Sequence, residues 1–307
     1  MIDKKIIFMG TPDIAAQHLN ILIENKLNLV GVFTQPPRKK NRGMQVEESA
    51  VHQIAKKNNI EIYYPSAIDQ TVIQQIKRLE PDLIIVVAYG IILPASFINI
   101  PKYGCINIHV SLLPRWRGAA PIEHALLAGD NKTGISIINI NSKLDAGDIL
   151  MQESFLLDQN MYSDDLTLKL TNLGKKAMIK ILPLIFKNKI IRKKQDENKV
   201  TFANKFLNED RKINFHNSTS DVYNHIRAHG PKPGSWFIYK GERIKIIKAK
   251  KTKESGQSST ILNKDFMIGC KDGGIIPLLI QREGKKIVNL VDFLRGFTFS
   301  IHDKLNV

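Results

Sequence analysis

Residues 83–88, Leu-Ile-Ile-Val-Val-Ala, constrain the fold more than any other stretch of the chain. Every residue in this run is apolar, and most are β-branched. A strand with one face in water alternates apolar and polar residues, so the run predicts a strand that is buried on both faces. Such strands belong to parallel sheets that helices cover on both sides.

The first part of the chain alternates strand and helix patterns. Residues 4–9 read as a buried strand, residues 14–23 as an amphipathic helix and residues 29–33 as a second strand. This β-α-β order predicts a doubly wound, mostly parallel, Rossmann-like α/β domain. A dinucleotide site would require three glycines after the first strand. Only Gly10 is present there, so we do not expect a nicotinamide cofactor.

The last third of the chain follows another pattern. After residue 206, short apolar stretches alternate with Gly, Lys and Asn, which predicts a small OB-like β-barrel. Before it lies a segment that is rich in charge and poor in core residues. We therefore expect a catalytic domain in residues 1–186, a basic linker in residues 187–205 and a C-terminal β-barrel domain in residues 206–307.

The net charge of +16 is unevenly distributed along the chain. Residues 1–166 carry 16 Lys and Arg against 17 Asp and Glu, whereas residues 167–307 carry 29 against 12. A basic second half suits contact with a polyanion, of which nucleic acid is the most plausible. Enrichment of Lys by an AT-rich genome is the alternative, but it does not explain the asymmetry.

Cysteine usage and hydropathy indicate the compartment. Cys105 and Cys270 lie far apart and have no metal-type spacing, which favours a reducing, cytoplasmic setting without disulfides or zinc. The start of the chain runs directly into a strand and lacks the features of a signal peptide. No apolar run reaches the length of a membrane span, so no membrane contact is expected.

Asn107 and His109 are the first candidate catalytic residues. They are two apart in a predicted strand, so they point to the same side, with Cys105 in the same row. An amide donor beside an imidazole can stabilise an oxyanion and move a proton, as acyl transfer requires. A buried structural histidine is the alternative for His109.

Two further segments should meet these residues. In open α/β sheets ligands bind beyond the carboxyl ends of the strands, so Tyr89 and Gly90 should rim one pocket with residues 111–114. Asp145 lies in a Gly-containing turn just before a strand, where its carboxylate can be held by N–H groups and aimed into a site. A plain Asx turn is the alternative there.

Residues 34–46 form a loop that is longer than a strand-to-helix connection usually needs. Its Pro-Pro and Arg-Gly elements argue against regular structure. Its basic residues are Arg38, Lys39, Lys40 and Arg42. This charge density favours contact with a phosphate backbone over a loop that is merely solvated.

Taken together, the motifs resemble one family, the methionyl-tRNA formyltransferases. The stretches that carry the resemblance are residues 9–12 (Met-Gly-Thr-Pro), 87–90 (Val-Ala-Tyr-Gly), 107–109 (Asn-Ile-His), 111–122 (Ser-Leu-Leu-Pro-Arg-Trp-Arg-Gly-Ala-Ala-Pro-Ile), 144–150 (Leu-Asp-Ala-Gly-Asp-Ile-Leu) and 292–296 (Asp-Phe-Leu-Arg-Gly). They span nearly the whole chain. The combination is far more specific than any one of its parts.

The resemblance implies transfer of a formyl group from 10-formyltetrahydrofolate to the α-amine of methionine on initiator tRNA. Asn107 and His109 would stabilise the tetrahedral intermediate, and Asp145 would orient His109 or a water molecule. The folate pocket would be lined by Ser111, Leu112, Leu113, Pro114, Tyr89 and Gly90. The loop with Arg38, Lys39, Lys40 and Arg42 would contact tRNA, Arg42 entering the acceptor stem. No metal is implied, and a monomer is expected.

The chain departs from the family pattern in three places. Met44 and Gln45 stand where two more basic residues are frequent, which predicts a weaker grip on tRNA. Val110 replaces an alanine, and residues 229–234 replace a stretch that bears an aromatic residue, which puts the packing of the two domains in question.

Formylation of glycinamide ribonucleotide or of amino sugars is an alternative that the basic second half disfavours. A non-catalytic RNA-binding protein is another, disfavoured by the presence of Asn107, His109 and Asp145.

Overall fold

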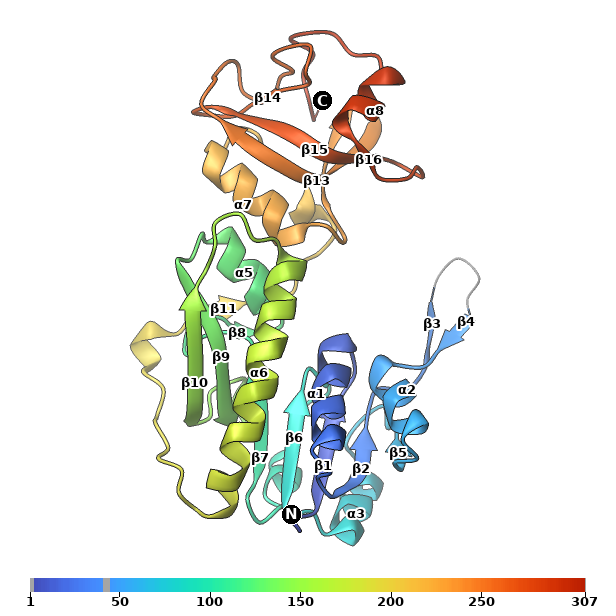
Figure 1. Ribbon diagram of the computed structural model, residues 1–307, viewed down its shortest axis with the longest axis vertical. Coiled ribbons are helices and arrows are strands. Elements are labelled where there is room, and N and C mark those ends of the chain that lie inside the picture. The colour runs from blue at the N-terminus through green and yellow to red at the C-terminus, as the bar shows by residue number, and fades with distance from the viewer. Residues whose placement is uncertain (1–2, 41–44, 307) are drawn as a thin grey trace. The chain divides into compact units, whose positions relative to one another are not determined.

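The structure is a computed structural model that describes residues 3–40 and 45–306 (Figure 1). The chain divides into two compact units. Unit 1 comprises Met1–Gly118, Gly134–Phe155 and Thr167–Phe202, and unit 2 comprises Ala119–Thr133, Leu156–Leu166 and Ala203–Val307. Each unit therefore draws on several separate segments of the chain.

Unit 1 is built on a seven-stranded sheet in the order β10-β9-β7-β6-β1-β2-β5. The strands are β1 (Ile6–Gly10), β2 (Leu29–Phe33), β5 (Ile62–Tyr63), β6 (Leu83–Val87), β7 (Cys105–His109), β9 (Lys132–Asn139) and β10 (Ile149–Leu156). The pairs from β7 to β5 are parallel, and β9 runs antiparallel to β7. The mostly parallel, Rossmann-like sheet predicted from the sequence is thus confirmed.

Helices cover both faces of this sheet, as the burial of β6 on both sides requires. They are α1 (Asp13–Glu24), α2 (Ala50–Lys57), α3 (Gln70–Leu79), α4 (Ala95–Ile98) and α6 (Ser163–Phe186). On one face, Ile7, Ile84 and Cys105 share a core cluster with Ile73 of α3 and Phe97 of α4. The opposite face of β7 meets α1 and α6. There Gly174 of α6 lies so close to His18 and Ile108 that a Cβ on it would come within 2.7 Å of His18 Nε2 and 3.2 Å of Ile108 Cγ2.

The basic loop contains a short hairpin, which corrects the expectation of irregular structure. Strands β3 (Arg38–Lys40) and β4 (Gln45–Glu47) pair antiparallel, with Arg38 opposite Glu47. The Pro-Pro pair ends just before β3, so it restricts the approach to the hairpin and removes no donor from it. A cross-strand pair of opposite charge also favours this register.

Unit 2 contains an antiparallel sheet in the order β12-β13-β15-β14, with β16 paired to β15. Its elements are α5 (Pro121–Leu127), η2 (Glu209–Arg211), α7 (Thr219–His229), β12 (Ser235–Tyr239), β13 (Glu242–Thr252), β14 (Ile268–Gly269), β15 (Gly274–Arg282), β16 (Val288–Asn289) and α8 (Leu290–Arg295). Helix α5 packs against α7. The core of this unit gathers Phe215, Phe237 and Ile246 with Tyr162, whose hydroxyl bonds both to the carbonyl and to the N–H of Ala249.

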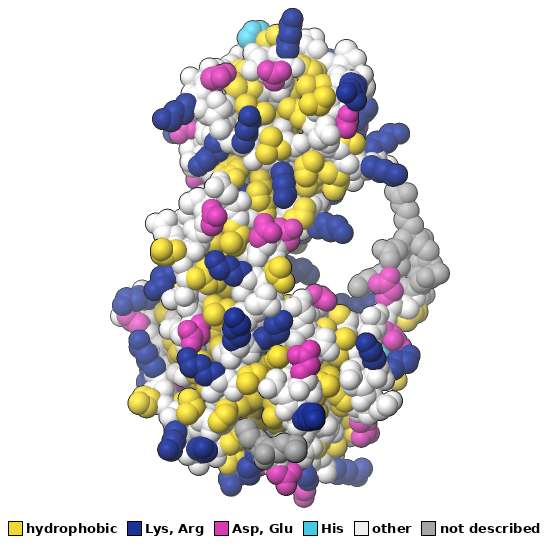
Figure 2. Space-filling model, in the orientation of Figure 1, with side chains coloured by type: hydrophobic (Ala, Val, Ile, Leu, Met, Phe, Trp, Pro, Cys, Tyr) yellow, Lys and Arg dark blue, Asp and Glu magenta, His cyan; other side chains and the backbone are white. Residues whose placement is uncertain are grey.

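Short elements complete the fold. A two-stranded pair joins β8 (Arg117–Gly118) to β11 (Phe202–Ala203), and η1 (Glu197–Lys199) is a single 3₁₀ turn. Within the described part of the chain, no helix combines the length and the apolar character that a membrane span needs. On the face drawn in Figure 2, Lys and Arg side chains are scattered over the surface with hydrophobic side chains between them.

Candidate active site

Strand β7 presents Asn107 and His109 on one face, as the period of two predicts. The strand is fixed on both sides, since Asn107 lies opposite Val86 of β6 and Ile138 of β9. Cys105, in the same row, lies in the core, where burial raises the pKa of its thiol to about 12. The row thus changes from apolar to polar toward the carboxyl end of the strand, where ligands bind in such sheets.

Asp145 is carried on a turn between β9 and β10 that brings it back toward β7. Asp145 has φ 47°, in the left-handed region that non-glycine residues seldom occupy. Two positions later, a Cβ on Gly147 would overlap the Asn139 carbonyl oxygen. Only glycine permits this close approach, so Gly147 lets the turn fold against the end of β9.

The carboxylate of Asp145 meets both predicted partners. Asn107 Nδ2 donates to Oδ1 at 3.3 Å, and the main-chain N–H of Gly118 donates to Oδ2 at 2.9 Å. His109 Nδ1 lies 3.5 Å from Oδ2. Asp145, which is distant in sequence, therefore meets Asn107 and His109 at one point of unit 1. His109 is only 6% exposed, whereas Asn107 and Asp145 are half-buried.

The hydrogen bond at the other nitrogen of His109 defines its tautomer. Nε2 lies 2.8 Å from the carbonyl oxygen of Trp116, which can only accept, so Nε2 carries a proton. In the neutral imidazole Nδ1 then holds a lone pair and faces the Asp145 carboxylate. This arrangement can take up a proton at Nδ1 and stabilise the resulting charge, which is the requirement for general base catalysis.

Residues 111–114 form a tight loop that the buried Ser136 and the exposed Gln152 hold in place. Ser136 Oγ accepts from the N–H of Leu113 at 3.0 Å and donates to the carbonyl of Ser111 at 2.7 Å. Gln152 Nε2 donates to the Leu113 carbonyl at 2.9 Å. Ser111 and Leu113 are buried, whereas Leu112 and Pro114 are half-buried. The outward surface of this loop therefore comes from Leu112 and Pro114.

Tyr89 and Gly90 follow β6 at the same edge of the sheet. The Tyr89 ring is buried, and burial raises the pKa of its hydroxyl, which has no partner among the described residues. Its main-chain carbonyl accepts from Thr11 Oγ1 at 3.1 Å and from Gln35 Nε2 at 2.8 Å. This segment can thus contribute main-chain atoms and Gly90, whose φ is 78°, to a pocket.

The four residues predicted to contact tRNA belong to the basic loop of residues 34–46. Arg38 opens β3 and is exposed. Lys39 and Lys40 belong to the same strand, which places their backbone at known register opposite Val46 and Gln45. Arg42 lies outside the described residues.

Several groups around the site were missed by sequence reasoning. Ser136 had a usable signal, because it is a lone hydroxyl in the apolar run of β9. The Gly118 N–H and the Trp116 carbonyl are main-chain groups, which side-chain patterns do not reveal. Gln195 contacts the Asp145 turn from a segment that looked like a solvated linker.

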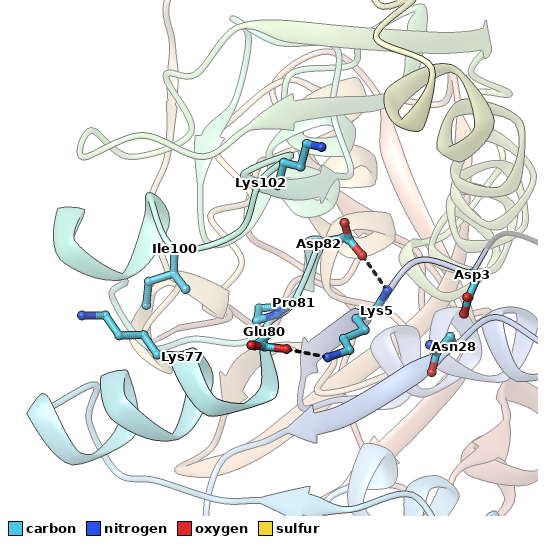
Figure 3. A pocket seen from close by; sticks show the side chains of 9 residues that line it. All are labelled: Asp3, Lys5, Asn28, Lys77, Glu80, Pro81, Asp82, Ile100 and Lys102. Carbon is cyan, nitrogen blue, oxygen red and sulfur yellow. Dashed lines mark hydrogen bonds and ion pairs between the residues drawn. The ribbon is translucent and has the colours of Figure 1, made fainter.

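A cavity of about 600 Å³ lies at the opposite edge of the sheet, by the amino ends of β1 and β6. Lys5 lines this cavity. Its side chain pairs with Glu80 at 2.9 Å, and its main-chain N–H donates to Asp82 (Figure 3). Three lysines and three carboxylates line it, so its charges balance and favour neither anion nor cation. The described residues contain no cluster of three or more His, Cys, Asp or Glu suited to hold a metal ion.

The fold and this geometry define a class: Rossmann-like α/β proteins with an amide, an imidazole and a carboxylate arranged for acyl-type transfer. The formyl transferase family model matches residues 4–182, and the model of the formyl transferase C-terminal domain matches residues 205–298. The chain belongs to the formyl transferase family.

Curated relatives match along almost the full length. The chain is 40% identical over 300 residues to methionyl-tRNA formyltransferase of Ehrlichia canis (strain Jake), covering 95% of this chain and 97% of the relative. It is 38% identical over 304 residues to methionyl-tRNA formyltransferase of Rickettsia bellii (strain RML369-C), covering 98% and 99%.

Solved structures share the fold at lower identity. An N-formyltransferase from Helicobacter canadensis, in complex with folinic acid and dTDP-3-aminofucose, has a TM-score of 0.68 at 23% identity, covering 92% of this chain and 100% of that one. HypX from Aquifex aeolicus, in complex with tetrahydrofolic acid, has a TM-score of 0.65 at 15% identity, covering 95% and 47%.

Proposed function

We propose that the protein transfers the formyl group of 10-formyltetrahydrofolate to the α-amino group of methionine on initiator tRNA. The observation that carries this proposal is the convergence of Asn107, His109 and Asp145 beside the loop of residues 111–114. Full-length relatives named for this activity support the choice of substrate. The product is formylmethionyl-tRNA, which serves translation initiation.

The reaction forms a bond from the amine nitrogen to the formyl carbon and breaks the bond from that carbon to the folate nitrogen. Negative charge develops on the formyl oxygen while the amine must lose a proton. Asn107 Nδ2 has two N–H groups and uses one on Asp145, so the second is available to the oxyanion. His109 takes the amine proton at Nδ1, and Asp145 stabilises the imidazolium. The imidazolium returns this proton to the folate nitrogen as the bond from that nitrogen to the formyl carbon breaks.

The two substrates bind on either side of this group. The folate lies against residues 111–114 and the edge at Tyr89 and Gly90, and Leu112 and Pro114 supply its apolar contacts. Residues 1–186 act as the catalytic domain, joined through residues 187–205 to a C-terminal tRNA-binding domain of residues 206–307. The net positive charge after residue 166 supports this division of labour.

The basic loop of residues 34–46 binds the acceptor stem. Arg38, Lys39 and Lys40 contact phosphates, and Arg42 enters the stem. The protein acts as a monomer in the cytoplasm. Two buried free cysteines, Cys105 and Cys270, suit a reducing compartment.

Formylation of an amino sugar is the second candidate, because the Helicobacter canadensis structure with the same fold holds dTDP-3-aminofucose. The test supplies 10-formyltetrahydrofolate with Met-tRNA, glycinamide ribonucleotide or a dTDP-amino sugar and measures formyl incorporation. We expect kcat/KM for Met-tRNA to exceed the others at least a thousandfold. Faster formylation of either small amine would reject the proposed substrate.

A further inference from the structure

One side-chain amide binds the main chain of the turn that carries Asp145. Gln195 Nε2 donates to the carbonyl oxygen of Asp145 at 2.7 Å and to that of Gly147 at 2.8 Å. An amide nitrogen has two N–H groups, so it satisfies both carbonyls at once. Gln195 therefore binds two main-chain carbonyl groups of the turn and does not bind the Asp145 carboxylate, which faces the site.

The orientation of the Gln195 amide is set by Arg117. Arg117 Nε donates to Gln195 Oε1 at 3.0 Å, and its terminal nitrogens donate to the two carboxylate oxygens of Glu197 at 2.8 and 3.3 Å. A guanidinium group has no acceptor, so Gln195 must turn its oxygen toward Arg117 and its nitrogen toward the Asp145 turn. Arg117 is 4% exposed, so packing and the bidentate ion pair together restrict its movement.

Arg117 also lies between the two main-chain groups that meet the catalytic pair. The residue before it supplies the carbonyl that accepts from His109 Nε2, and the residue after it supplies the N–H that donates to Asp145 Oδ2. A shift of Arg117 would thus move the partners of both side chains. Gln195 connects this segment to the Asp145 turn by side-chain hydrogen bonds.

The chain around Gln195 is fastened to the same loops. Lys193 and Ile149 exchange two main-chain hydrogen bonds, at 2.8 and 2.9 Å. Thr201 Oγ1 accepts from the N–H of Trp116 at 2.9 Å. The segment that carries Gln195 is thus anchored at residue 193 before it and at residue 201 after it, which limits the movement of its amide.

We propose that Gln195 is a positioning residue for formyl transfer, which sets the direction of the Asp145 carboxylate through the main chain of its turn. This inference rests on the catalytic role of Asp145 in the proposed function. Asp145 has a positive φ, so its turn needs external hydrogen bonds to stay in one conformation. Gln195 provides them without touching the reacting atoms.

The first test replaces Gln195 by methionine, which keeps the length of the side chain and removes its hydrogen bonds. We expect kcat for Met-tRNA formylation to fall by about tenfold to hundredfold, because small displacements of a catalytic group cost rate. KM for both substrates should change by less than about twofold. Asp196→Ala is the matched control, since Asp196 is adjacent but, among the residues that the structure describes, its side chain bonds to the Asn198 N–H and to Lys199 and not to the Asp145 turn. It should keep the wild-type kcat.

The second test separates positioning from general stability by repeating Gln195→Met in an Asp145→Ala background, with single-turnover rates. If Gln195 acts through Asp145, its substitution should have no further effect there. An equal fold-loss in both backgrounds, or an unchanged kcat for Gln195→Met alone, overturns the inference. Should Gln195→Met unfold below the assay temperature, Gln195→Asn, whose amide is one methylene short, takes its place in the same comparison.

The Asp145→Ala variant by itself distinguishes a failure of the positioning role of Gln195 from a failure of the proposed function. A large loss of rate in Asp145→Ala with none in Gln195→Met rejects only the positioning role. A normal rate in Asp145→Ala rejects the assignment of Asp145 in the proposed function, and the role of Gln195 with it.

Discussion

The side-chain amide of Asn107 has two N–H donors, of which one bonds to Asp145. If the other stabilises the oxyanion, Asn107→Ala should lower kcat by about 10²–10³ and leave folate and tRNA affinity nearly unchanged. Asn99→Ala, at an exposed helix end in the same unit, is the control and should behave as wild type. A rise in KM at constant kcat would instead assign Asn107 to substrate binding.

His18 is a buried histidine that takes no part in the site. Its Nδ1 bonds to the Ile14 carbonyl at 2.7 Å, and its Nε2 has no partner among the described residues. Burial, the largest cause, lowers its pKa from 6.5 to about 4. The folded chain therefore excludes a proton that the unfolded chain binds below pH 6.5.

The sign of the resulting pH dependence follows from linkage. The contribution of His18 is fully present above pH 6.5 and is lost as pH falls from 6.5 to about 4, at a cost of about 3 kcal/mol. Urea unfolding at several pH values should show a shallower acid slope for His18→Gln than for wild type. His216→Gln, at an exposed position, should keep the wild-type slope. Parallel slopes for His18→Gln and wild type would contradict the prediction.

At the scale of one element, Ser136 governs the loop of residues 111–114. Ser136→Ala leaves the buried Leu113 N–H and the Ser111 carbonyl without their partner, at a cost of about 1–3 kcal/mol in unfolding free energy. The loosened loop should raise KM for 10-formyltetrahydrofolate by about tenfold and change kcat less. Thermal unfolding and steady-state kinetics measure both, with exposed Ser154→Ala as control. An unchanged folate KM would show that the loop does not bind folate.

Elements with a strong local pattern could be predicted from the sequence. The buried run of β6 and the alternation in β7 depend on burial and on the period of two, and both lie where expected. The β3–β4 hairpin was missed because a proline pair comes directly before it and its strands are only three residues long. Gln195 was missed because its partners are backbone carbonyls, which leave no trace in side-chain spacing.

At the scale of the whole molecule, composition predicts a linker in residues 187–205, but contacts within unit 2 join segments on both sides of it. Helix α5 packs against α7, and the His124 and Phe206 rings stack with centroids 4.6 Å apart. Tyr162 belongs to the core of unit 2. Long-range packing of this kind is not encoded in local patterns, so charge and strand spacing alone could not reveal it.

A fragment of residues 1–205 tests the importance of that packing. It keeps α5 and Tyr162 but loses α7 and β13, so it exposes apolar surface. We expect a lower unfolding temperature than the full chain and strong binding of a hydrophobic dye. A fragment that unfolds at the wild-type temperature without binding dye would show that unit 2 contributes little to the stability of residues 119–166.

The most direct test of the central claim is the single-turnover rate of formyl transfer to Met-tRNA by His109→Ala, with both substrates saturating. If His109 takes the amine proton at Nδ1, the rate should fall by roughly 10²–10⁴, the range for a positioned acid–base group. Folate-analogue binding should stay within about twofold of wild type, because the loop of residues 111–114 keeps its own hydrogen bonds through Ser136 and Gln152. A rate near that of wild type would return His109 to a structural role and contradict the account of the site.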